Sequence, residues 1–105
     1  MRDRKFDKRR RQLIEAIEQN PDDKDNHLIL AKFYFINECY AETIEVYKKL
    51  SQYYPKDIAV LYNLGVVYQA DKQLEEAKKA YLRVISLDPT NKGASEALEK
   101  ITTFK

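Results

Sequence analysis

Few side chains in this sequence could do chemistry, and none has the companions that such chemistry needs. His27 is the only histidine and Cys39 the only cysteine, so the chain can assemble neither a histidine-based metal site nor a conventional catalytic triad. The adjacent carboxylates Glu75 and Glu76 fall at the start of a predicted helix, where negative charge is favourable without any acid–base role. We therefore expect no enzyme, no metal and no cofactor, and we expect His27 and Cys39 to be packing residues.

A basic segment opens the chain. Residues 1–12 hold seven Lys or Arg and two Asp, a net charge of +5, whereas the whole chain carries +2. The segment could contact an anionic surface, but the consecutive residues Arg9, Arg10 and Arg11 point around a helix rather than along one stripe. We expect a solvated face here, and we disfavour nucleic acid and membrane as partners. The helix is expected to pack on the next one through its apolar residues, which are Phe6, Leu13, Ile14 and Ile17.

The composition predicts one charge-rich helical domain. A chain of 105 residues buries roughly 65% of its unfolded surface, which is enough for a core without metal or disulfides. Two Gly and three Pro leave little room for glycine-rich ligand loops. No apolar run has the length of a membrane span, and a single cysteine favours a reducing compartment, so we expect a cytoplasmic protein.

An internal period of 34 residues organises the chain. Pro21, Pro55 and Pro89 follow this spacing, and the same shift superposes three residues that favour helix N-caps, Asp23, Asp57 and Asn91. The period also aligns apolar and aromatic residues: Leu30 with Leu64 and Leu98, Tyr34 with Tyr68, Leu13 with Tyr47 and Tyr81, and Phe6 with Tyr40 and Leu74. A period of this length indicates stacked helical units.

Residues 58–91 resemble a tetratricopeptide repeat. The signature positions of that family fall on Leu61, Leu64, Gly65, Tyr68, Ala77, Tyr81, Val84 and Pro89. Residues 24–57 fit less closely, because His27, Ala31, Thr43 and Leu50 depart from the family pattern. The resemblance implies an all-α fold, a right-handed solenoid of antiparallel helix pairs, in which small residues such as Gly65 and Ala77 let two helices approach closely.

We predict six helices in a single domain. Their expected spans are 3–19, 25–37, 41–53, 58–70, 75–87 and 92–103. The domain divides into an N-terminal capping helix at 1–20, repeats at 24–57 and 58–91, and a C-terminal capping helix at 92–105. The structural positions of the repeats are Leu30, Ala31, Tyr34, Leu64, Gly65, Tyr68, Ala77, Tyr81, Pro55 and Pro89.

Two charged residues support the idea of capping helices. Arg9 stands at the repeat position of Ala77, and Glu99 stands at the position of Gly65. A charge at either position disfavours a closely packed partner helix, and terminal repeats need polar outer faces. We therefore expect one capping helix, two repeats and a second capping helix to form the unit.

The resemblance implies that the first helix of each pair lines a concave groove that holds another protein. The groove positions of the family fall on Leu28, Lys32, Phe35, Tyr62, Asn63, Val66, Gln69 and Lys100. An apolar strip with a polar rim suits an amphipathic helix or an extended peptide, although neighbouring helices could cover Phe35 and Ile36.

The acidic tails of heat-shock chaperones are disfavoured as ligands. The family's two-carboxylate clamp would fall on Leu28, Lys32, Asn63, Gly93 and Ala97, of which only Asn63 matches. We therefore predict an adaptor that binds a partner protein, with a self-assembling homo-oligomeric scaffold as the alternative. Binding of an anionic surface through the basic first helix is a less favoured third function.

Overall fold

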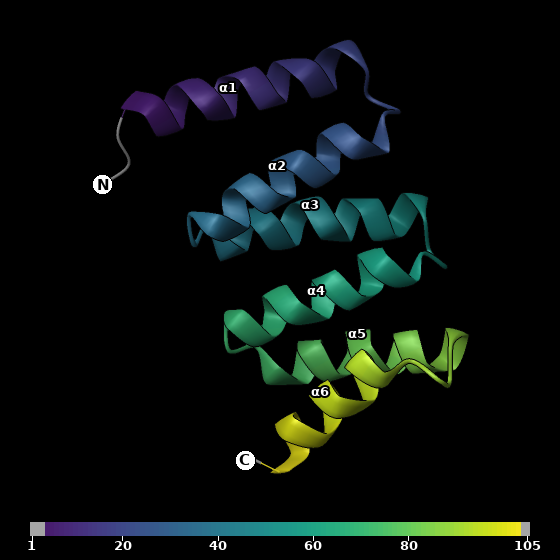
Figure 1. The fold of residues 1–105 in the computed structure, drawn as a ribbon. Coiled ribbons are helices and arrows are strands. Elements are labelled where there is room, and N and C mark those ends of the chain that lie inside the picture. Colours follow the sequence, from purple (N-terminus) through teal and green to yellow (C-terminus); the bar gives the residue numbers. More distant parts are fainter. Residues whose placement is uncertain (1–3, 104–105) are drawn as a thin grey trace.

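The computed structural model describes residues 4–103, which form six helices and no strand. The helices lie one after another in a stack, with α1 at one end and α6 at the other (Figure 1). Their bounds are α1 Arg4–Gln19, α2 Lys24–Ile36, α3 Tyr40–Tyr53, α4 Ile58–Ala70, α5 Leu74–Leu87 and α6 Lys92–Thr103. The predicted all-α solenoid is confirmed, and the predicted helix ends differ from these by at most one residue. Residues 1–3 and 104–105 of the predicted capping helices lie outside the described part of the chain.

The three predicted N-cap residues hold the starts of α2, α4 and α6. The Asp23 carboxylate accepts a hydrogen bond from the backbone N–H of Asp25 at 3.0 Å. Asp57 accepts one from the N–H of Val60 at 3.1 Å, and Asn91 accepts one from the N–H of Ala94 at 2.9 Å. Each side chain satisfies a donor that the first helical turn leaves unpaired.

Tight turns join α2 to α3 and α4 to α5. Glu38 and Lys72, which are 34 residues apart, occupy the same place in the two turns and have φ values of 59° and 62°. This left-handed conformation is costly for residues other than glycine. The sequence predicts a polar turn at residues 71–73 but gives no glycine to reveal the left-handed residue.

Close packing is greatest between α4 and α5. Ala77 and Val84 have no exposed surface and Tyr81 is 1% exposed. The remaining structural positions on the helices are buried as well: Leu30, Ala31, Tyr34, Leu64, Gly65 and Tyr68. Pro55 and Pro89 are exposed and lie just beyond the ends of α3 and α5, where proline opposes further helix.

The pair of α2 and α3 packs differently. Thr43, at the position of Ala77, is fully buried, and its hydroxyl donates to the backbone carbonyl of Cys39 at 2.7 Å. Cys39 is itself buried, as expected. His27 is half-buried, and its Nε2 lies 2.9 Å from the carbonyl oxygen of Pro21.

Helix α1 packs on α2 through only part of its apolar face. Phe6 and Leu13 are buried, and the Phe6 ring stacks on Phe33 with centroids 4.8 Å apart. Ile14 is 37% exposed and is covered less completely than expected, because it faces α2 across a hollow that His27 and Leu30 also line.

No helix within residues 4–103 has both the length and the apolar character needed to cross a membrane.

Candidate functional site

Two hollows lie on the face formed by α2, α4 and α6, and they meet at Val66. The first, of about 330 Å³, is lined by Leu28, Lys32, Phe35, Tyr47, Asn63, Val66 and Val67. The second, of about 420 Å³, is lined by Tyr62, Val66, Gln69, Ala70, Tyr81, Gly93, Glu96, Ala97 and Lys100. All eight residues predicted for the groove line one hollow or the other. We call this surface the α2–α4–α6 groove.

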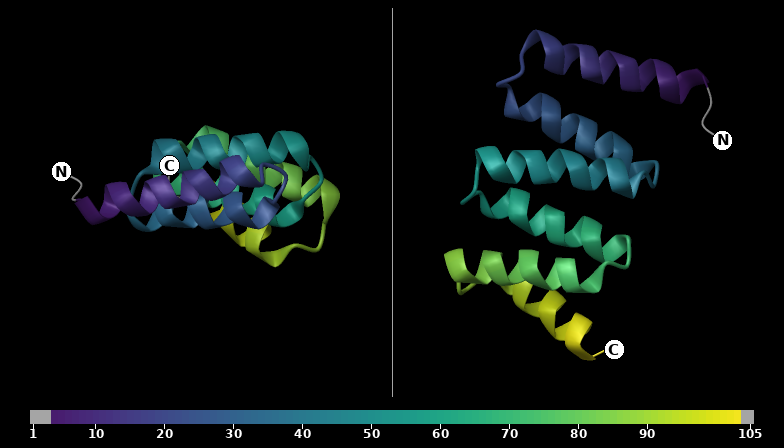
Figure 2. Two further views of the ribbon diagram at one scale, coloured as in Figure 1. Left: turned by 90° about the horizontal axis from the view of Figure 1, so that it is seen from above. Right: turned by 180° about the vertical axis from the view of Figure 1, so that it is seen from behind.

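The stacking of the helices explains why these residues gather. The groove helices follow one another at 34-residue intervals, and in the view from above α2 and α6 lie on the opposite side of the stack from α3 (Figure 2). Residues at one repeat position therefore form a row across the groove. One row contains Lys32, Val66 and Lys100, with an apolar side chain between two cations. The neighbouring row contains Leu28, Tyr62 and Glu96.

The two amide side chains of the groove are held by buried tyrosines. The Tyr81 hydroxyl donates to Oε1 of Gln69 at 2.9 Å. Burial raises the pKa of Tyr47, an effect partly offset by a hydrogen bond with the Asn63 side chain. Burial also raises the pKa of Tyr81 to about 12. Because these tyrosines stay neutral near pH 7, both amides keep their partners, and part of their hydrogen-bonding capacity is committed to packing.

Tyr62 forms a wall of the groove as well as part of its lining. A Cβ atom added to Gly93 would lie 2.9 Å from Cε1 of Tyr62, so the ring rests directly against the start of α6. The Tyr62 and Tyr81 ring centroids are 5.7 Å apart. Tyr62 therefore joins α4 to both α5 and α6, a role that the sequence does not predict.

The apolar residues at the α2 end differ in exposure. Phe35 is half-buried, and its ring centroid lies 5.6 Å from that of Tyr40. Ile36 is 67% exposed, so the alternative that a neighbouring helix covers it is wrong for this residue. Lys32 and Lys100 are exposed, and neither forms an ion pair within the described part of the chain. Lys32 therefore places positive charge at the α2 flank of the apolar centre, whereas Lys100 at the α6 flank stands beside Glu96, which lines the same hollow.

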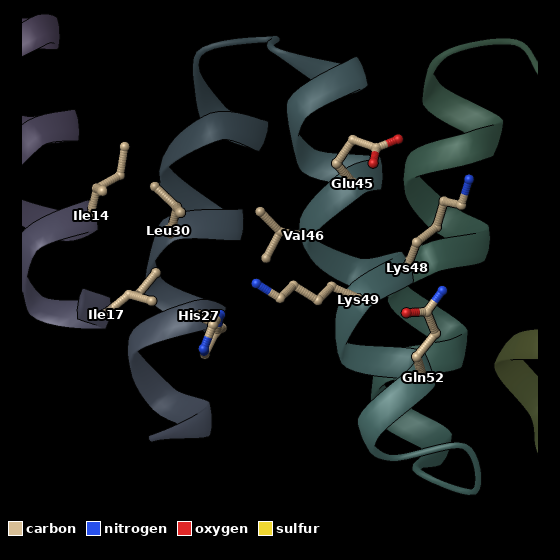
Figure 3. Close-up of a pocket in the computed structure, with 9 residues that line it drawn as sticks. All are labelled: Ile14, Ile17, His27, Leu30, Glu45, Val46, Lys48, Lys49 and Gln52. Carbon is tan, nitrogen blue, oxygen red and sulfur yellow. The ribbon is translucent and has the colours of Figure 1, made fainter. Parts of the chain in front are cut away.

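A third hollow, of about 590 Å³, lies between α1, α2 and α3 and was missed by the sequence analysis. Its lining is Ile14, Ile17, His27, Leu30, Glu45, Val46, Lys48, Lys49 and Gln52. Ile14, Ile17, Leu30 and Val46 form its apolar part, and the Lys49 side chain extends across it toward His27 (Figure 3). The repeat period could have indicated this hollow: Ile14 shares its repeat position with Lys48, and lysine prefers solvent, so the position is one that faces outward.

Within residues 4–103, no group of three His, Cys, Asp or Glu side chains is placed to hold a metal ion.

Comparison with known proteins gives one family match and many structural neighbours. Residues 58–91 match the family model of the tetratricopeptide repeat. No curated protein sequence matches the chain significantly.

Three solved structures illustrate the fold. The first tetratricopeptide-repeat domain of Spaghetti (RPAP3), bound to the HSP90 peptide SRMEEVD, is 25% identical with a TM-score of 0.80, over 94% of this chain and 79% of that one. The Arabidopsis OM64 domain is 18% identical with a TM-score of 0.79, over 96% and 84% of the two chains. MamA is 19% identical with a TM-score of 0.77 over 95% of this chain, which spans only 57% of MamA. The last two likenesses concern the fold alone.

Proposed function

From the premise that this chain is a tetratricopeptide-repeat protein, we propose that it is an adaptor whose α2–α4–α6 groove binds a segment of a partner protein. The bound segment presents apolar side chains to the centre of the groove and acidic side chains to its two lysines. The chain does no chemistry on the segment; it holds it.

One observation carries this proposal: the row formed by Lys32, Val66 and Lys100. Val66 belongs to both hollows, so a side chain seated there contacts the two halves of the groove at once. The flanking lysines have no ion-pair partner within residues 4–103, and each can meet a carboxylate of the ligand. Such a pattern suits an amphipathic helix or an extended peptide.

The neighbour bound to the HSP90 peptide supports a peptide ligand of acidic character. A chaperone tail itself remains a poor candidate for this chain. At the expected clamp positions Leu28 is apolar, the Asn63 amide is bonded to Tyr47, and Gly93 lies beneath Tyr62. Only Lys32 offers a free cation there. We therefore favour an apolar segment with acidic flanks over a ligand held by its terminal carboxylate.

A selection from a displayed library of random peptides tests the proposal. We expect the selected peptides to combine apolar residues with Asp or Glu, and to lose binding to a Val66→Glu variant. Lys32→Glu and Lys100→Glu should each weaken binding roughly fivefold, because an exposed charge pair contributes up to about 1 kcal/mol. Peptides that bind all three variants as well as the wild type would refute the groove as the site.

Matched variants keep this test specific. Lys56→Glu makes the same charge change at an exposed residue in the loop between α3 and α4. Ile14→Glu introduces the same acid into the hollow between α1 and α3. Both should bind the selected peptides like the wild type. Capture from cell extract with the wild type and the Val66→Glu variant, both confirmed to be folded, would then identify the natural partner.

A further inference from the structure

The hollow between α1, α2 and α3, which we call the α1–α3 hollow, shares no lining residue with the α2–α4–α6 groove. At about 590 Å³ it is larger than either hollow of the groove. Its apolar part consists of Ile14 and Ile17 from α1, Leu30 from α2 and Val46 from α3, and Figure 3 shows these side chains around one space. The packing of the three helices leaves this space unfilled, although protein interiors are otherwise closely packed.

The hollow lies where the first repeat departs from the second. His27 stands at the repeat position of Leu61, which is only 7% exposed. A leucine thus fills this position in the second repeat. The His27 ring instead lies with its Nε2 2.9 Å from the carbonyl oxygen of Pro21 and is half-buried. The space beside Leu30 that a leucine would fill therefore stays open.

Helix α1 adds apolar side chains at positions where α3 is polar. Ile14 and Ile17 share their repeat positions with Lys48 and Ser51 of α3. Ile14 is 37% exposed and Ile17 is half-buried. Apolar side chains that face outward and are grouped around one hollow, with polar residues at its rim, are typical of a surface that binds another molecule.

Two lysines of α3 supply positive charge to the hollow. Lys48 and Lys49 are exposed, and neither forms an ion pair within residues 4–103. Of the two, Lys49 extends across the hollow toward His27 (Figure 3). The lining also contains one acid, Glu45, so its cations outnumber its anions. A bound group with an acidic side chain on its α3 flank complements this arrangement.

The walls of the hollow favour a helical occupant. Helices α1 and α3 run in the same direction with α2 between them (Figure 1), and the backbone groups within each helix are already paired. An extended segment would lose water from its own backbone groups here, and Gln52 is the one amide side chain among the lining residues that could replace it. A helix satisfies its own backbone groups, so it needs only side-chain contacts.

We propose that the α1–α3 hollow is a second binding site, which takes an amphipathic helix of another protein. The apolar face of that helix lies against Ile14, Ile17 and Val46, and an acidic residue on its flank pairs with Lys49. The chain then holds two partner segments at once, one in the groove and one in this hollow. The proposal does not depend on what the groove binds.

A displayed library of helical peptides tests the proposal. Each peptide has leucines at positions i, i+3, i+4 and i+7 and random residues on both flanks, and the selection uses folded Val66→Glu protein, in which the groove is blocked. We expect the selected peptides to be enriched in Asp or Glu on one flank, to bind the wild type equally well, and to gain helical circular dichroism on binding. A proline in the middle of a selected peptide should abolish binding.

Substitutions in the hollow locate the binding site. Ile14→Glu should weaken binding of the selected peptides roughly tenfold, because it sets a charge against their apolar face. Lys49→Glu should weaken binding roughly fivefold, as expected for an exposed charge pair. The matched controls are Leu82→Glu and Arg83→Glu, which change exposed residues at the same two repeat positions on α5 and should bind like the wild type.

His27→Leu tests the hollow without adding a charge. The leucine restores the residue type of the second repeat, so the variant should remain folded. Because its side chain fills the space beside Leu30, the affinity for the selected peptides should fall roughly tenfold. Unchanged affinity of this variant, or peptides that bind Ile14→Glu and Lys49→Glu as well as the wild type, would overturn the proposal. So would a selection that yields no peptide binding more tightly than about 1 mM, or binders that tolerate the central proline.

The two binding sites can fail independently of each other. Peptides selected for the groove should not compete with the helical peptides, and Ile14→Glu should leave the groove peptides bound. Sedimentation velocity checks the other occupant, a second copy of the chain. If the wild type self-associated, Ile14→Glu abolished that association and no helical peptide bound, the hollow would be a contact between copies and the proposal would be refuted.

Discussion

A methyl group added at Gly65 should destabilise the protein, although alanine is the better helix former. A Cβ atom there would lie 2.8 Å from Cε1 and 2.9 Å from Cδ1 of Tyr81, closer than real contacts allow. The Tyr81 ring cannot move aside easily, because it is 1% exposed and its hydroxyl is bonded to Gln69. The methyl group must therefore push the two helices apart or break that hydrogen bond.

The magnitude follows from three opposing effects. Overpacking a tight core typically costs about 1–3 kcal/mol. Loss of the Tyr81 hydrogen bond adds about 1 kcal/mol, and replacing a mid-helix glycine by alanine returns about 1 kcal/mol. We expect Gly65→Ala to lower the free energy of unfolding by about 2 kcal/mol and Tm by roughly 8–16 °C. Gly65→Leu should prevent folding.

Thermal and urea unfolding, followed by circular dichroism, provide the assay, and Gly93→Ala is the control. Its Cβ would lie 2.9 Å from Tyr62, a distance as short as that at Gly65, but Tyr62 is only half-buried and its ring can swing outward. The control should be neutral or up to about 1 kcal/mol more stable. If Gly65→Ala proved as stable as Gly93→Ala, the assigned contact between α4 and α5 would be wrong.

Three further predictions concern other parts of the fold. Asp57→Ala should lower the free energy of unfolding by about 1–2 kcal/mol, because Asp57 caps α4 and pairs with Lys24. Asp57→Asn keeps the cap and should lower it less, and urea unfolding midpoints measure both variants. The hydrogen bond from Lys24 lowers the pKa of Asp57, so the pair stabilises the fold above about pH 4. This contribution is lost as the pH falls through the lowered pKa, and the stability of the two variants should then approach that of the wild type. Tyr81, with its pKa raised to about 12, should be the last tyrosine to ionise in an ultraviolet titration, and Tyr81→Phe should remove that last ionisation step. The stability linked to Tyr81 should fall as the pH rises from about 10 through its raised pKa. Lys72→Gly should raise the unfolding free energy by about 0.5 kcal/mol, because glycine relieves the left-handed φ of 62° at some entropic cost, and Lys56→Gly should not; equal effects would contradict this account.

The helices were predictable because the same physical demand recurs every 34 residues. Helix starts need a side-chain acceptor, which Asp57 and Asn91 supply, and closely paired helices need a small residue such as Ala77. Those demands select residue types that can be recognised by their spacing alone. The positions of the groove residues followed from the same period, while their role in binding stays a prediction.

The missed features depend on how particular side chains turn. The sequence does not show that the Tyr62 ring lies over Gly93, or that Gln69 is bonded to Tyr81. Both follow from the angle at which α6 and α5 meet α4. The exposure of Ile14 was missed because periodicity separates an apolar face from a polar one but cannot tell which neighbouring helix covers that face.

The rows of residues across the groove do not repeat one residue type, because the side chain at each row position changes from one helix to the next. The row of Leu28, Tyr62 and Glu96 runs from an apolar side chain at α2 to an acidic one at α6, while its neighbour has lysines at both ends. A segment lying across the three helices therefore meets an apolar surface with one cation at its α2 end and a mixed pair of charges at its α6 end. A segment bound in the opposite direction would place its apolar side chains against Glu96 and its polar side chains against Leu28. Those polar groups would lose water without gaining hydrogen bonds, which is unfavourable. We therefore expect a selected peptide to bind in one direction only, and its reversed sequence to bind at least tenfold more weakly in a titration. Equal binding of the two sequences would mean that charge alone, and not the graded lining of the groove, holds the partner.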